Sequence, residues 1–145
     1  MKNIFAFIAL LLTISIYSPA ADFDARAAFG FAPGRSLDAA KKKAQAEGKR
    51  IFLVAHDPRG DYNNQGLQIK YFTDLDETKK LIKENFIVVV VPVGNKDLAE
   101  ISGGTNMERP RFFLLSPTGA KVRDDSMAKN SADGLRIIKE LIALP

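Results

Sequence analysis

The chain has 145 residues, enough for one domain with a buried core, and it contains no cysteine and no tryptophan. Without cysteine it supplies no thiolate for disulfide exchange, nucleophilic catalysis, zinc binding or iron–sulfur ligation. The formal charge of +4, or +3 without Lys2, is too small to indicate a nucleic-acid partner by charge alone.

Residues 1–20 have the layout of a secretory signal peptide. Lys2 precedes an almost uninterrupted apolar run over residues 4–17, and the small residues that follow place a cleavage site after Ala20. The run is shorter than the roughly 20 residues needed to cross a bilayer, which favours a cleaved leader over an uncleaved membrane anchor. We therefore expect a periplasmic or secreted mature chain with no stable membrane insertion.

Residues 21–35 are predicted to form an N-terminal arm. This segment is rich in alanine, glycine and phenylalanine, and its apolar residues follow no sustained period. We expect the arm to place the side chains of Phe23, Phe29 and Phe31 on the body of the protein.

The first predicted helix begins at Ser36, which is a good N-cap residue. Leu37, Ala40 and Ala44 recur at helical spacing and form its apolar face, and Gly48 ends it.

Two continuous apolar runs, residues 51–55 and 86–91, have the length of strands and show no polar alternation. Such runs are typical of strands that are buried on both faces of a sheet. Between them a helix is predicted with Asp74 as N-cap and Glu77 at its third position. The apolar side of this helix is formed by Leu75, Ile82 and Phe86. Strand, helix and strand together predict a βαβ unit with a parallel pair.

The second half predicts a short helix over residues 98–101, a break at Gly103-Gly104, and a hairpin. The hairpin strands are residues 110–115 and 120–122, joined by the Pro/Gly turn at 116–119.

The last predicted helix begins at Asn130 or Ser131. Its apolar face consists of Leu135, Ile138 and Ile142, with Leu141 beside them. The order of elements predicts an α/β domain over residues 36–145, with a mixed sheet of about four strands and helices on both faces.

Several short motifs occur in a fixed order along the chain. They are Ala39-Ala40-Lys41, Gly48-Lys49, Ile51 to Val54, Phe72-Thr73-Asp74, Glu84-Asn85-Phe86, Pro110 to Leu115, and Ser116-Pro117-Thr118-Gly119. In this order the chain resembles the thioredoxin fold, and within it the exported thioredoxin-like proteins. The resemblance implies a thioredoxin-like three-layer sandwich, with Pro110 as the cis-proline that begins a strand.

The resemblance fails where these proteins carry Cys-x-x-Cys. Eleven residues before Phe72, the usual distance in these relatives, the sequence reads Asp61-Tyr62-Asn63-Asn64. Asp61 and Asn64 thus replace the two cysteines, and neither a carboxylate nor an amide can form the mixed disulfide that exchange requires. Asp61 can instead act as a helix N-cap, which accepts a backbone N–H bond. We therefore predict a chain that is no thiol-disulfide oxidoreductase and has no catalytic residue, cofactor or metal.

In redox relatives, the backbone beside the cis-proline pairs with an extended client segment. The resemblance therefore implies a docking surface made of Asp57, Asp61, Tyr62, Asn64, Arg109 and Pro110. Arg109 favours acidic clients, because a guanidinium group binds carboxylates in a bidentate manner. The main hypothesis is an exported, non-redox protein-binding or chaperone-like module whose client is an extracytoplasmic protein or peptide.

Two alternatives remain open from the sequence. His56, Asp57 and Asp61 follow a buried strand, where open α/β sheets bind ligands, and this placement allows a non-thiol enzyme or a metal site. A single histidine without metal-ligand spacing favours ordinary turn and cap residues instead. The other alternative is a structural subunit of an envelope complex that docks through the phenylalanines of the arm.

A nucleic-acid partner is not expected. Tyr62, Tyr71, Phe112 and Phe113 could stack on bases, but Phe112 and Phe113 fall in a predicted central strand and are expected to be core.

Overall fold

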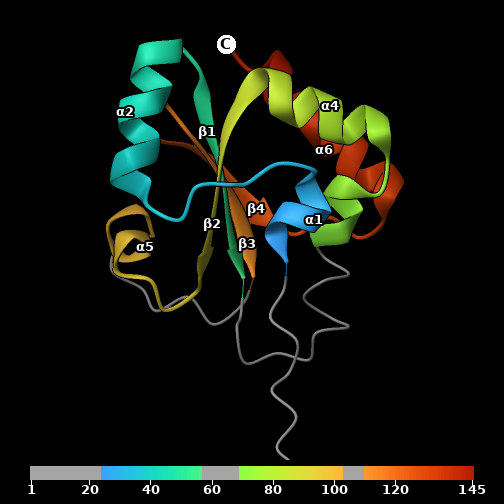
Figure 1. Ribbon diagram of the computed structural model, residues 1–145, viewed down its shortest axis with the longest axis horizontal. Helices are drawn as coiled ribbons and strands as arrows, with labels where there is room; N and C mark the ends of the chain where they lie inside the picture. The colour runs from blue at the N-terminus through green and yellow to red at the C-terminus, as the bar shows by residue number, and fades with distance from the viewer. Residues whose placement is uncertain (1–23, 57–68, 103–109) are drawn as a thin grey trace, which may run out of the picture.

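The structure, a computed structural model, describes residues 24–56, 69–102 and 110–145. It is a four-stranded sheet with helices on both faces (Figure 1). The strands are β1 (Arg50–His56), β2 (Phe86–Pro92), β3 (Arg111–Leu115) and β4 (Lys121–Ser126). The helices are α1 (Ala25–Phe29), α2 (Leu37–Glu47), α4 (Asp76–Asn85), α5 (Lys96–Ile101) and α6 (Ser131–Ala143), and residues 69–73 are also helical. The predicted α/β class and mixed sheet are confirmed.

The sheet has the strand order β2-β1-β3-β4. β1 pairs in parallel with β2, so that Ile51 lies opposite Ile87, and in antiparallel with β3, so that Ile51 also lies opposite Leu115. α4 connects the parallel strands, which confirms the predicted βαβ unit. β4 completes the hairpin with β3 and forms the outer edge on that side.

The side chains of β1 alternate between two apolar cores. Phe52 and Val54 pack with α4 and α6, whereas Ile51, Leu53 and Ala55 pack with α2 and α5. All five side chains are 0% exposed. Figure 1 shows why, because the sheet lies between α2 and α5 on one face and α4 and α6 on the other. The continuous apolar run of the sequence therefore results from burial on both faces.

Both ends of α2 are as predicted. The Ser36 hydroxyl accepts a bond from the Ala39 N–H at 3.4 Å. Gly48 ends the helix with a φ of 63°, a left-handed conformation that glycine adopts without strain. Leu37, Ala40 and Ala44 are buried, as their spacing indicates.

The predicted N-cap role of Asp74 is wrong. Residues 69–73 are helical, and the Asp74 N–H donates to the Lys70 carbonyl at 2.7 Å, so Asp74 ends that helical segment. Its carboxylate accepts a bond from the Ser131 hydroxyl at 2.8 Å, which connects it to the start of α6.

The N-cap of α4 is Leu75, which supplies no side-chain bond. Leu75 is 38% exposed and therefore does not belong to the buried side of the helix, whereas Ile82 and Phe86 do. Glu77 forms an ion pair with Lys139 of α6 at 2.8 Å and closes no capping box. These corrections move the helix start by one residue and leave the packing of α4 on the sheet unchanged.

α6 begins with a reciprocal cap. The Asn130 side chain accepts a bond from the Asp133 N–H at 2.9 Å, and the Asp133 carboxylate accepts one from the Lys129 N–H at 3.0 Å. The Lys129 N–H bond, followed by the Arg136 guanidinium, lowers the pKa of Asp133 below its usual value.

The buried face of α6 is shifted from the prediction. Ile138 and Leu141 are buried as expected, together with Gly134 and Ile137, whereas Leu135 and Ile142 are only half-buried.

The N-terminal arm contains more structure than its sequence indicates. α1 is a five-residue helix, and Gly34 forms an isolated parallel bridge with Val89 of β2. Phe29 is buried in the core under α4 and α6, Phe31 is half-buried, and Phe23 lies outside the described residues. A single turn of helix is too short to produce the repeated apolar spacing that identifies longer helices.

None of the helices in the described ranges is long and apolar enough to span a membrane.

Gly134 is the point of closest approach between α6 and the helical segment 69–73. A Cβ at this position would overlap the backbone carbonyl of Tyr71. We expect Gly134→Ala to lower the free energy of unfolding by about 2 kcal/mol, because overpacking outweighs the gain in helix propensity of about 1 kcal/mol.

Urea denaturation measures this difference. Gly94→Ala is the matched control, since a Cβ there meets no atom within 4 Å, and its unfolding free energy should change by less than about 0.5 kcal/mol. Equal effects of the two substitutions would contradict the packing described for Gly134.

Candidate functional site

The ends of three strands meet at one end of the sheet, which we call the carboxyl edge because β1 and β2 both finish there. His56 ends β1 and lies opposite Pro92, which ends the parallel strand β2. β3 runs in the opposite direction, and its first residue, Arg111, lies opposite Ala55. Pro110 therefore lies at the same edge as His56. Open α/β sheets place their ligands beyond the carboxyl ends of parallel strands, so this edge is the candidate site.

Of the six residues of the predicted docking surface, the structure places Pro110, which is half-buried. Five lie outside the described residues: Asp57, Asp61, Tyr62, Asn64 and Arg109. The peptide bond before Pro110 includes Arg109, so its cis geometry stays a prediction.

His56 lines a cavity of about 750 Å³ that the sequence did not indicate. His56 is half-buried, and its backbone carbonyl accepts a bond from the Val93 N–H at 2.8 Å. The arm supplies three charged residues to the same cavity: Asp24, Arg26 and Arg35. Two guanidinium groups against one carboxylate give this cavity an excess of positive charge, which suits a ligand that carries carboxylates.

The arm reaches this cavity because it is fixed at several points. The Asp24 carboxylate accepts a bond from the Ala27 N–H at 3.0 Å and begins α1, and Gly30 ends α1 with a φ of 74°. Phe29 is 2% exposed, and its ring centroid lies 5.8 Å from that of Phe31. The sequence signal for this helix is Asp24, a good N-cap residue, followed six residues later by Gly30, a residue that commonly ends helices.

Arg111, two residues after the predicted Arg109 contact, is paired within the chain. Its guanidinium group lies 3.1 Å from the Asp124 carboxylate, and Lys121 contacts the same carboxylate at 3.5 Å. Arg111 and Lys121 thus share one carboxylate, whereas Arg26 and Arg35 make no ion pair with any residue that the structure describes.

Aromatic rings support the site from within the core. Phe52 lies 5.4 Å from Phe72 and 5.8 Å from Phe112, and Phe72 lies 5.7 Å from Phe112, measured between ring centroids. These contacts fix the helical segment 69–73 on the sheet. Phe112 and Phe113 are core residues, as expected, and are not available to stack on bases.

The enzyme or metal hypothesis depended on His56 with Asp57 and Asp61, and both aspartates lie outside the described residues. Within the part of the chain that the structure describes, no three His, Asp or Glu side chains are grouped as metal ligands. The charged residues that share the His56 cavity are instead mainly arginines, which bind anions rather than metal ions.

Solved thioredoxin-fold structures are similar to this one. A thioredoxin from Thermus thermophilus has a TM-score of 0.60 and 19% identity, covering 77% of this chain and 87% of that chain. A disulphide isomerase from Xylella fastidiosa Temecula1 has a TM-score of 0.55 and 14% identity, covering 72% of this chain and 87% of that chain. No protein-family model and no curated protein matches the sequence. The predicted thioredoxin-like fold is confirmed, and identities this low show the fold alone.

We expect Phe29→Ala to release the arm from the His56 cavity. Removing a buried phenylalanine side chain lowers the free energy of unfolding by about 3 kcal/mol, and the half-buried Phe31 should contribute less. Urea denaturation measures both variants, and hydrogen exchange reports on the arm through the Gly34 and Val90 amides, which form the bridge to β2. If Phe31→Ala is as destabilising as Phe29→Ala, Phe29 is not the anchor.

Proposed function

From a thioredoxin-like fold without cysteine, we propose that this chain is an exported, non-redox module that binds other proteins in a chaperone-like manner. The observation that carries the proposal is the combination of a four-stranded thioredoxin-like sheet and a chain with no cysteine to act as a sulfur nucleophile. Disulfide exchange requires a thiolate of the enzyme itself, so the chain lacks this activity by its own residues. Binding of extended segments uses backbone pairing and side-chain pockets, so it needs no thiolate.

The proposed client is an extracytoplasmic protein or peptide with an extended acidic segment. The docking surface is the one that the sequence predicts, from Asp57 to Asn64 together with Arg109 and Pro110. Arg26 and Arg35 support the preference for acidic clients, because both line the cavity at the same edge of the sheet.

The proposed location outside the cytoplasm rests on residues 1–20, which have the composition and order of a cleaved leader.

The structure bears on the proposal of a permanent envelope subunit. Phe29, one of the three phenylalanines assigned to partner contact, packs in the core of its own chain. It is therefore not available to another protein, which favours client binding over docking through the arm.

Crosslinking in the native envelope tests the proposed function. A photoreactive residue at Tyr62 or Arg109 should capture several different proteins, whereas the same residue at Val122, 46% exposed on the outer strand β4, should capture none of them. Capture of a single partner, in a constant molar ratio to this chain, would support the structural subunit instead. Absence of any crosslink would exclude this docking surface.

His56→Ala tests the enzyme alternative in the same cells. We expect this variant to keep its crosslinks and its biological activity, since binding at this edge needs no imidazole chemistry. Loss of activity with unchanged crosslinks would favour an enzyme that uses His56.

A further inference from the structure

The arm covers the outer edge of β2 at one point. The Gly34 N–H donates to the Val88 carbonyl at 2.8 Å, and the Val90 N–H donates to the Gly34 carbonyl at 3.0 Å. β2 is the last strand of the sheet on its side, so this edge has no neighbouring strand. In the described part of the chain, Gly34 forms the only bridge to it.

The edge of β2 continues before this bridge. In a parallel pair, the backbone groups of alternate residues point to opposite sides of the strand. Because the Val88 carbonyl and the Val90 N–H point away from β1, the Phe86 carbonyl and the Val88 N–H point the same way. These two groups are placed to bond with an added strand.

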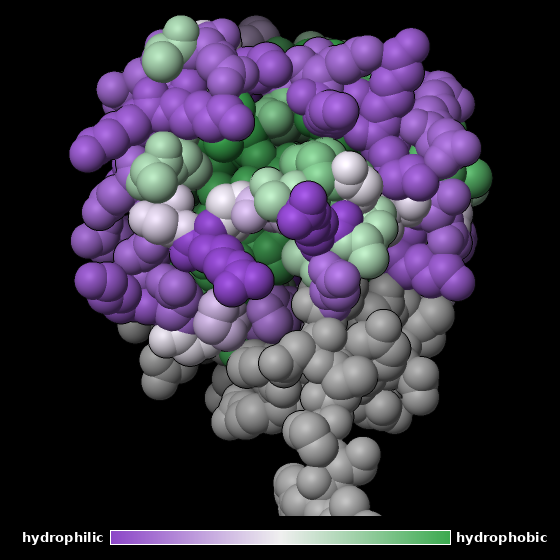
Figure 2. Space-filling model, viewed as in Figure 1, coloured by the Kyte–Doolittle hydropathy of each residue, from purple (hydrophilic) through white to green (hydrophobic). Residues whose placement is uncertain are grey.

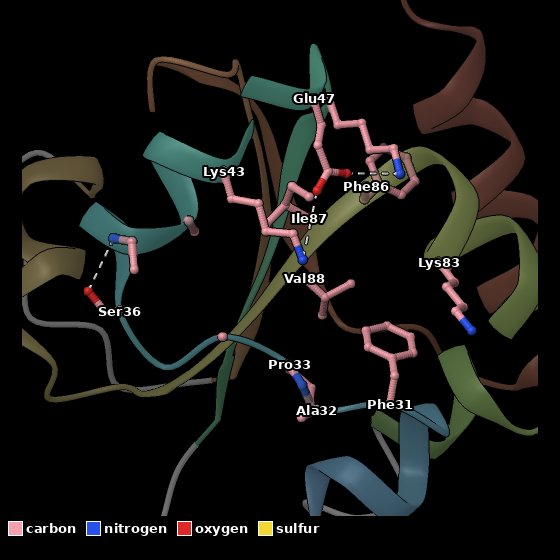
Figure 3. Close-up of a pocket in the computed structure, with 14 residues that line it drawn as sticks. Phe31, Ala32, Pro33, Ser36, Lys43, Glu47, Lys83, Phe86, Ile87 and Val88 are labelled. Atoms are coloured by element: carbon pink, nitrogen blue, oxygen red, sulfur yellow. Dashed lines mark hydrogen bonds and ion pairs between the residues drawn. The ribbon is translucent and has the colours of Figure 1, made fainter. Parts of the chain in front are cut away.

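A groove follows this part of the edge, which we call the β2-edge groove. It is a cavity of about 470 Å³ between the arm, α2 and the first residues of β2 (Figure 3). Phe86, Ile87 and Val88 line it from the sheet, and the exposed Ala39 lines it from α2. Figure 2 shows an apolar hollow on this face, surrounded by hydrophilic side chains.

The rim of the β2-edge groove is positively charged. Lys43, Lys49 and Lys83 line it, against the single carboxylate of Glu47. Glu47 lies 3.9 Å from Lys43 and 3.3 Å from Lys49, so one carboxylate is shared by two ammonium groups. Lys83, on α4, makes no ion pair with the residues that the structure describes, and Figure 3 shows its side chain extending beside the groove. The rim therefore has an excess of positive charge for an anionic ligand.

We propose that the β2-edge groove binds a short extended acidic segment of a partner protein by strand addition. At about 3.3 Å per residue, three extended residues match the length of β2 from Phe86 to Val88. The main chain of the segment bonds to the Phe86 carbonyl and the Val88 N–H. Successive side chains of the segment point to opposite faces of the sheet, one toward Ala39 and Lys43 of α2 and the next toward Lys83 of α4. A segment that combines acidic and apolar residues therefore fits best.

This inference goes beyond the proposed function, because the groove is formed by other residues than the docking surface at the carboxyl edge. Crosslinks from Tyr62 or Arg109 report on that docking surface, and peptide binding reports on the groove. Either one can fail while the other holds.

The test uses a fluorescent peptide of alternating glutamate and valine, with fluorescence anisotropy as the readout. We expect saturable binding that weakens about tenfold in the Lys43→Glu/Lys83→Glu variant, because attraction to the rim becomes repulsion. The matched control is Lys42→Glu/Lys96→Glu, which makes the same change of charge at exposed lysines outside the groove. Its affinity should stay within about twofold of the parent chain.

A second variant separates shape from charge. Ala39→Phe places a ring in the groove from an exposed helix position, so it should weaken peptide binding without unfolding the chain. Amide shifts of Val88 and Gly34 on peptide addition would support strand addition at this edge. The proposal is overturned if the peptide does not bind, if both charge variants lose affinity equally, if Ala39→Phe binds normally, or if free glutamate competes as well as unlabelled peptide.

Discussion

Burial of β1 on both of its faces is the constraint on which the rest of the structure depends. The five side chains from Ile51 to Ala55 are fully buried, and they alternate between two separate cores. A strand of this kind must be covered by helices on both sides, so α2 and α5 pack on one face and α4 and α6 on the other. Because the chain has no cysteine, this packing stabilises the fold without help from a disulfide.

Because both faces of β1 are covered, the candidate binding surfaces lie at the ends of the strands and at the outer edge of β2. The carboxyl ends of β1 and β2 meet the start of β3 beside His56. Among the residues that the structure describes, Gly34 is the one that pairs with the outer edge of β2. The N-terminal arm contributes to both places. It supplies Arg26 and Arg35 to the His56 cavity and forms one wall of the β2-edge groove. Phe29 anchors the arm in the core, and the arm in turn contributes to the shape and charge of both candidate binding surfaces.

The sequence predicts those features that depend on long apolar runs or on strong local signals. The buried runs identify β1 and β2, and Ser36 and Gly48 mark the ends of α2. Features that depend on contacts between distant residues are not predictable in this way. Asp74 has the sequence pattern of an N-cap, but the helical segment before it and Ser131 of α6 use its backbone and side chain. Asp24, Arg26 and Arg35 reach His56 only through the folded arm, so no spacing in the sequence indicates that cavity.

The central claim is a thioredoxin-like fold that performs no disulfide exchange. The most direct measurement is the rate at which dithiothreitol reduces insulin, followed by turbidity, with and without the purified chain and with a cysteine-containing thioredoxin as positive control. We expect the chain to leave the rate equal to that of dithiothreitol alone, because a mixed disulfide needs a sulfur atom that it lacks. Acceleration of insulin reduction by the chain would contradict the account.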